Sequence, residues 1–254
     1  MGELEVPGDG EAPVDSAPAG RPGFYAARLV YQQLQTISGQ VLGIPAGGTI
    51  LNTNTIYALV DIDAEGNYVQ RTCGVEIRSQ DADGSSGLFE SDITPSPNIF
   101  PNIAPHTRKI LWTEQGWELP MSGFPVGWEA SDEAEAIPTS DSDARVRDTD
   151  QDGNPGITIV LSGNLFASGE LYAVQRMRNR VVGRFDGDNL VGENFDQSEQ
   201  EVLGGTIIDT QQTVADAGDS QTNRADLVLR PPDTLTCTQL LADPGAVFPA
   251  HPVY

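Results

Sequence analysis

The chain is poor in positive charge, in cysteine and in histidine, and each shortage argues against a class of protein. Lys and Arg number 14 against 37 Asp and Glu, so the formal net charge is -23. Such a surface repels phosphate groups, and we therefore expect no nucleic-acid partner. The cysteines, Cys73 and Cys237, form no C-x-x-C pair and lie far from both histidines, which argues against a zinc site. No apolar run reaches the roughly 18 residues that a membrane-spanning helix needs.

Residues 1–23 lack apolar periodicity and are rich in Gly, Pro, Ala and acidic residues. This composition predicts a flexible tether, followed by a single β domain over residues 24–254. The first residues have neither the basic start nor the apolar core of a signal peptide. We interpret the tether as the segment that follows a removed export signal, or the lipidated cysteine of a bacterial lipoprotein. This reading predicts a protein that is secreted or lies at the outer cell surface or in the periplasm. A cytosolic protein with a disordered tail is the alternative.

Cys73 and Cys237 are predicted to form one disulfide. Two lone cysteines in an exported protein usually pair with each other. The bond would join an early strand to the C-terminal segment and close a very long loop. The alternative is a pair of buried free thiols.

Strand patterns recur along the chain between turns that contain Gly, Pro, Asn and Asp. In residues 55–62 the side chains of Ile56, Ala58, Val60 and Ile62 fall on one face, which is the period of a strand. We therefore predict an all-β fold, an antiparallel barrel or sandwich with long irregular loops and at most one short C-terminal helix. Further strands are predicted over residues 24–37, 68–78, 109–119, 157–161, 171–178, 180–185, 190–195, 200–208 and 225–230. Loops are predicted over residues 38–48, 79–108, 120–152 and 209–223, and the helix over residues 237–242.

The segment 148–156 is the clearest candidate for a binding site. Asp148, Asp150 and Asp152 occupy alternate positions, and Gly153 allows a tight turn that directs their oxygens to one point. The carbonyl of Asn154 can add a further oxygen. A hard cation such as Ca²⁺ takes six to eight oxygen ligands and relieves the repulsion among close carboxylates. The segment predicts a calcium site, with a solvated acidic turn as the alternative.

This segment resembles the calcium loops of EF-hands, of thrombospondin type 3 repeats and of FG-GAP repeats. The EF-hand pattern would end in a bidentate Glu where this chain has Ile159, and a strand rather than a helix is predicted to follow. FG-GAP loops share the following strand but commonly place Asp where Gly156 stands. The resemblance therefore implies a site and not a fold. The whole chain also resembles a type of uncharacterised bacterial secreted lipoprotein, in which an Asp-rich loop precedes a strand such as residues 169–176 here.

Two further features suggest alternative functions. The aromatic residues Trp112, Trp117, Phe124 and Trp128 either line a pocket for a small apolar ligand, as in a lipocalin-like carrier, or belong to the core. The 37 acidic residues leave room for a polysaccharide hydrolase that uses paired carboxylates. Common nucleophile and nucleotide motifs are missing, and His106 is the one candidate for a catalytic base. We therefore expect a non-catalytic, secreted or surface-anchored calcium-binding β protein.

Overall fold

The computed structural model describes residues 20–41, 44–82, 91–163, 168–206, 210–216 and 223–250. Most of the predicted tether, residues 1–19, lies outside the described residues. The strands are β1 (Gly23–Val41), β2 (Ile44–Ile62), β3 (Asn67–Asp81), β4 (Ser91–Pro95), β5 (His106–Lys109), β6 (Leu111–Thr113), β7 (Gly116–Val126), β8 (Ile157–Gly163), β9 (Gly169–Asp186), β10 (Asn189–Asp196), β11 (Glu199–Gly205), β12 (Thr210–Asp216) and β13 (Arg224–Arg230). The helices are α1 (Ile99–Asn102), α2 (Cys237–Ala242) and the 3-10 turn η1 (Pro244–Ala246).

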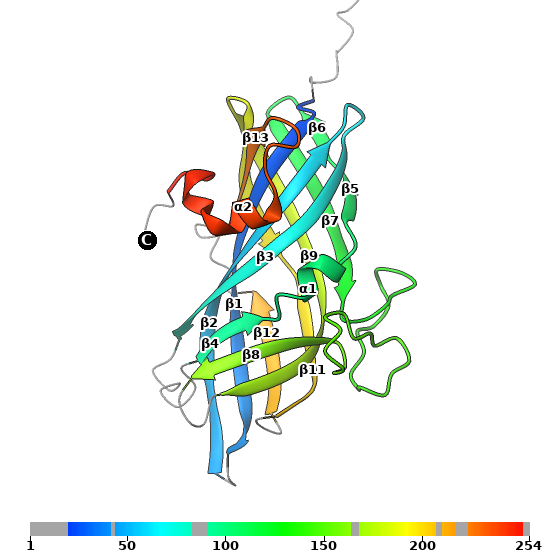
Figure 1. Cartoon of the computed structure of the whole chain (residues 1–254), viewed down its shortest axis with the longest axis vertical. Helices are drawn as coiled ribbons and strands as arrows, with labels where there is room; N and C mark the ends of the chain where they lie inside the picture. Colours follow the sequence, from blue (N-terminus) through cyan, green and yellow to red (C-terminus); the bar gives the residue numbers. More distant parts are fainter. Residues whose placement is uncertain are drawn as a thin grey trace, which may run out of the picture.

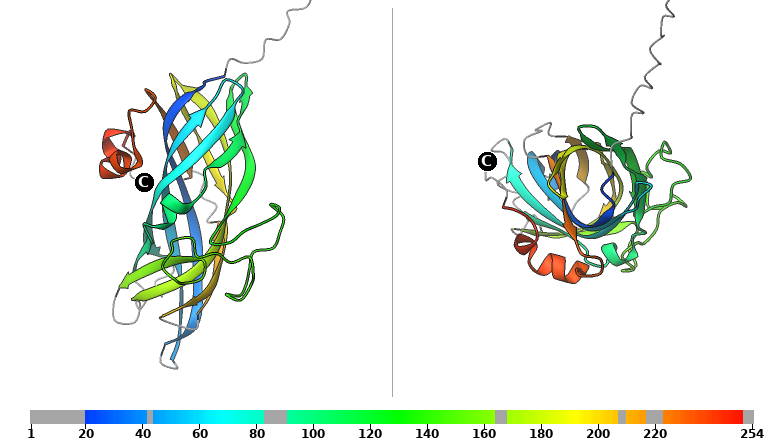
Figure 2. Two further views of the ribbon diagram at one scale, coloured as in Figure 1. Left: turned by 45° about the vertical axis from the view of Figure 1, so that its right-hand side comes forward. Right: turned by 90° about the horizontal axis from the view of Figure 1, so that it is seen from above.

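The strands form one antiparallel sheet, which confirms the predicted all-β fold. Its order is β4-β8-β9-β10-β13-β1-β2-β3-β5, and β11, β12, β6 and β7 pair beside this path. The sheet curls on itself into a barrel-like shape (Figures 1 and 2). No helix in the described part of the chain has the length and apolar character to cross a membrane.

The main core lies inside the curl of the sheet. Tyr25, Ala27 and Leu29 of β1 alternate inward and meet the face of β2 that carries Ile56 and Ala58. This is the face that the period-two pattern predicts. A second cluster lies between α2, with the residues after it, and the outer face of β1 and β2. A third cluster is built on side chains of β7, β8 and β9.

Arg108 links β5 to β7 and β9 across the curl. Its side chain is buried and donates to the carbonyls of Leu119 and Pro120, at the point where the β7–β9 register shifts. It also donates to the side chain and carbonyl of Asn179 on β9. Because one guanidinium carries five donors in a planar fork, a single residue can satisfy several carbonyls that the shifted register leaves unpaired.

Several predicted loops are strands. β1 and β2 continue through much of residues 38–48, β7 runs to Val126, and β12 occupies part of residues 209–223. Residues 79–108 contain β4, β5 and the one-turn helix α1, which was not predicted. The strands predicted over 171–178 and 180–185 are one long strand, β9. Neighbouring strands supply the backbone hydrogen bonds in each case, so pairing outweighs the local Gly and Pro signals.

The predicted disulfide is present between Cys73 on β3 and Cys237 at the start of α2, with a Cα–Cα distance of 5.0 Å. The predicted helix over residues 237–242 is also confirmed. Thr236 caps it, because its side chain accepts from the backbone N–H of Gln239. Leu240 and Phe248 then bury against the outer face of the sheet. The disulfide therefore holds the C-terminal segment on the barrel-like body.

Residues 129–147, the acidic loop, are folded around Trp128. The indole is buried, and its Nε1 donates to the carbonyl of Gln175 at 2.9 Å. The guanidinium groups of Arg145 and Arg176 lie over the ring at 5.5 Å and 5.4 Å from its centroid. Arg145 also pairs with Glu135 and Asp143 of the same loop. The acidic loop, which was predicted to be irregular, is therefore attached to β9 through the guanidinium groups of Arg145 and Arg176 that stack on Trp128.

Candidate metal site

The predicted metal loop, residues 148–156, begins where the acidic loop returns to the sheet. The backbone N–H of Arg147 donates to the carbonyl of Gly127, and that of Thr149 donates to the carbonyl of Gly156. Gly156 has a φ of 84°, and a Cβ there would lie 2.2 Å from the carbonyl oxygen of Ala173. Only glycine fits this crowded turn with a positive φ. The loop is therefore seated directly on β9 before it enters β8.

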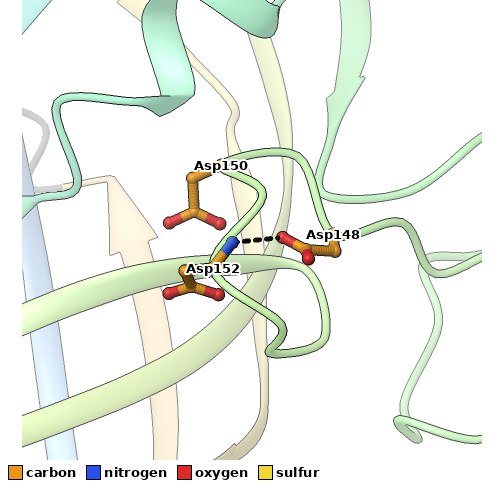
Figure 3. A group of neighbouring side chains, drawn as sticks. All are labelled: Asp148, Asp150 and Asp152. Atoms are coloured by element: carbon orange, nitrogen blue, oxygen red, sulfur yellow. Dashed lines mark hydrogen bonds between the residues drawn. The ribbon is translucent and has the colours of Figure 1, made fainter.

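The structure brings the three predicted aspartates together. One carboxylate oxygen from each of Asp148, Asp150 and Asp152 lies within 4.8 Å of the others. Figure 3 shows the carboxylate of Asp150 beside that of Asp152, with Asp148 facing them across the turn. Three oxygens at this separation could bind one cation if each shifts by a fraction of the gap, since calcium–oxygen distances are about 2.3–2.6 Å.

Hydrogen bonds orient the carboxylates of Asp148 and Asp152, the first and last of the three aspartates. Asp148 accepts from the N–H groups of Asp152 at 3.2 Å and Gly153 at 2.9 Å. Asp152 accepts from the N–H of Asn154 at 2.9 Å and from the hydroxyl of Thr158 at 2.5 Å. Burial raises the pKa of Asp152, but these hydrogen bonds outweigh it, so the pKa is lowered. Each side chain is thereby oriented while lone pairs remain on its oxygens.

Asp150 differs from its neighbours because it is buried, with 1% of its surface exposed. Its Oδ2 accepts from the backbone N–H of Thr158 at 3.1 Å, whereas its Oδ1 accepts no hydrogen bond from the described residues. Burial raises the pKa of Asp150 and outweighs the opposing effects of Thr158 and the nearby Ser96 hydroxyl. A buried carboxylate oxygen without a donor is costly, and a bound cation would remove that cost.

Two contacts of the loop were not predicted. Thr158, the second residue of β8, holds both Asp150 and Asp152, and Gln151 donates to the side chain of Asn102 in α1 at 3.2 Å. The position of Thr158 just after the loop is the one signal that could have suggested its role. Nothing in the sequence places Asn102 here. Asn154, the fourth predicted ligand, contributes its N–H to Asp152, and its predicted carbonyl ligand stays a prediction.

The four aromatic residues predicted as a pocket occupy different places. Trp117 is buried in the main core and Trp112 packs against that core, whereas Trp128 lies under Arg145 of the acidic loop and Arg176 of β9. Phe124 lines a cavity in the sheet interior, together with Tyr31, Met177, Asp196 and His106. The cavity measures about 10 Å³, which is room for about one water molecule.

His106, the candidate catalytic base, does not lie between an acid and a serine, as the histidine of a catalytic triad does. Ser122 donates to the carboxylate of Glu133 at 3.0 Å and lies 3.3 Å from Nε2 of His106. Because a carboxylate only accepts, Nε2 must donate to Ser122. The serine therefore stands between the acid and the imidazole, where the imidazole cannot remove its proton. Burial lowers the pKa of His106 to about 4, and the nearby Arg108 adds to the effect.

Acidification from pH 7 to pH 5 should destabilise the protein more than it destabilises the variant His106→Gln. The unfolded chain binds a proton at His106 near pH 6.5, but the folded protein does so only near pH 4. The unfolded state therefore gains protons first, and stability falls as the pH drops through this interval. Urea denaturation at pH 7 and pH 5 measures both losses. Equal losses in the two proteins would contradict the shifted pKa.

The sequence matches no protein-family model, and comparisons with curated proteins and with solved structures find no match either.

Proposed function

We propose that this chain is a non-catalytic, secreted or surface-anchored calcium-binding β protein in which Asp148, Asp150 and Asp152 bind a structural Ca²⁺. The observation that carries the proposal is the burial of Asp150, a member of the carboxylate cluster, whose Oδ1 accepts no hydrogen bond from the described residues. A bound Ca²⁺ would give this oxygen the positively charged partner that it lacks. A solvated acidic turn, the alternative, would place its central carboxylate in water rather than bury it.

The ligand set favours calcium over magnesium. Three carboxylates, the proposed carbonyl of Asn154 and water offer oxygens in a flexible turn, which suits the variable coordination of Ca²⁺. Magnesium demands a tighter octahedron and gives up its water less readily. Since no carboxylate closes the loop at Ile159, we expect dissociation constants of roughly 10⁻⁴–10⁻³ M, as in extracellular modules.

The Cys73–Cys237 disulfide supports the proposed location. Structural disulfides persist mainly in oxidising compartments such as the periplasm and the cell exterior. Millimolar calcium, which a weak site requires, is also typical of extracellular modules. A lipid anchor at the native N-terminus remains part of the proposal. The lipocalin-like carrier, the polysaccharide hydrolase and the lack of a nucleic-acid partner stay predictions.

Calcium should stabilise the folded protein. Binding to the native state alone contributes about 2.7 kcal/mol at a hundredfold excess over the dissociation constant. Chemical denaturation with 10 mM CaCl₂ and with EGTA measures the difference, and MgCl₂ should give a smaller one. The variant Asp150→Asn keeps the shape of the side chain but removes its charge, so it should lose the response.

Asp188→Asn is the matched control for this experiment. Asp188 lies in the exposed turn between β9 and β10, where its only described ion pair is 3.9 Å long. This variant should respond to calcium as the wild-type protein does. If 10 mM calcium leaves the stability of the wild-type protein unchanged, the solvated acidic turn is the correct reading.

A further inference from the structure

Residues 91–103, which contain β4 and α1 and are called the β4–α1 segment, lie at the edge of the sheet next to the proposed calcium site. β4 is the last strand of the sheet order and pairs with β8 alone among the described strands. α1 follows after a short turn and has a single helical turn. An edge strand and a one-turn helix have few hydrogen bonds of their own, so their position depends on contacts with neighbouring elements.

This β4–α1 segment covers the third apolar cluster of the protein. Ile99 is buried with 2% of its surface exposed, and Ile93, Phe100 and Ile103 pack around it. Beneath them lie the side chains of β7, β8 and β9 that form the floor of the cluster, namely Val126, Ile157, Ile159, Leu171 and Ala173. If the segment moved away, this floor would be exposed to water.

The metal loop holds the β4–α1 segment at two points. The first runs through Thr158, whose N–H is bound by Asp150 and whose carbonyl accepts from the N–H of Ser96 at 2.9 Å. Ser96 in turn accepts from the N–H of Ile99, the first residue of α1. The second is the hydrogen bond from Gln151 to Asn102, at the end of α1. The loop is therefore linked to the start of α1 through Thr158 and Ser96, and it contacts the end of α1 directly.

We propose that calcium at this site controls the β4–α1 segment and so covers or exposes the apolar floor beneath it. The inference rests on the proposed function, and it is supported by the buried Oδ1 of Asp150, for which the described residues supply no hydrogen bond. Without the cation, three carboxylates within 4.8 Å repel one another. Relaxation of the loop then releases Thr158 and Gln151 from their positions. With calcium bound, both contacts are fixed and the segment closes.

The C-terminal segment serves as an internal reference. α2 covers a different apolar cluster and is held by the Cys73–Cys237 disulfide, far along the chain from the metal loop. Stabilisation of the whole fold alone would slow exchange equally in both regions, whereas control of the β4–α1 segment should slow exchange more over residues 91–103 than over residues 237–248.

Hydrogen exchange of the full chain, with 10 mM CaCl₂ and with EGTA, tests the proposal alongside calorimetric titration with CaCl₂. We expect calcium to slow exchange at least tenfold more for the amides of Ser96, Ile99 and Ile103 than for those of residues 237–248. An apolar fluorescent dye should bind several-fold more strongly in EGTA. The variant Asn102→Ala, which removes the acceptor of Gln151 without changing the metal loop, should bind calcium normally and show a smaller effect on Ile103.

The outcomes separate the two proposals. If titration shows no calcium binding, the proposed function fails and this inference falls with it. If calcium binds but exchange over residues 91–103 stays the same, or slows equally over residues 237–248, the site is purely structural and the control of the β4–α1 segment is overturned.

Discussion

Replacement of both cysteines by alanine should lower the free energy of unfolding by about 5 kcal/mol. Cys73 and Cys237 are 164 residues apart, and the bond between them closes a loop that contains most of the sheet. In the chain-entropy model, a crosslink over a loop of this length removes roughly 5 kcal/mol of conformational freedom from the unfolded state. Urea denaturation of the double variant and of the wild-type protein measures the difference.

Reductant provides the control for this prediction. Wild-type protein unfolded and refolded in dithiothreitol should match the double variant, and the variant itself should not respond to dithiothreitol. Since alanine keeps these positions apolar, the loss of packing between β3 and α2 is small compared with the loss of the crosslink. A wild-type protein as stable in reductant as in its absence would show that the disulfide constrains little.

The variant Trp128→Ala should lose about 3–5 kcal/mol of stability, the usual cost of removing a buried Trp side chain. Trp128 is 4% exposed, donates to the carbonyl of Gln175 and lies beneath Arg145 and Arg176. Its removal leaves a cavity and frees the cations that hold the acidic loop. We expect faster proteolysis within residues 129–147 as well as a lower denaturation midpoint.

Phe195→Ala is the matched control for Trp128→Ala. Phe195 also carries a stacked guanidinium, that of Arg180 at 6.0 Å, but its side chain is 39% exposed. An exposed contact of this kind contributes about 0.5–1 kcal/mol. Equal losses in the two variants would mean that burial of Trp128 does not organise the acidic loop.

Part of the candidate metal site was predictable because its pattern is local. Alternate aspartates followed by Gly153 bring three carboxylates together through the turn alone, and the structure places their oxygens within 4.8 Å. The burial of Asp150 was not predictable, since burial depends on packing against other parts of the chain and the alternating pattern does not record it. The same holds for Asn102, which reaches the loop only because α1 lies across it.

The sequence by itself determined the all-β class, the C-terminal helix, the cysteine pair and the aspartate cluster of residues 148–152. The strand class and the cluster follow from short-range rules, namely a period of two in residues 55–62 and carboxylates on alternate positions. The cysteine pair follows because the chain has two cysteines. Only the tertiary structure decided that the sheet curls, that β7 continues past Pro120 at a shifted register, and that Arg108 and Trp128 join distant strands. Those features depend on hydrogen bonds and packing between residues far apart in the chain, and no local pattern records which distant partner completes them.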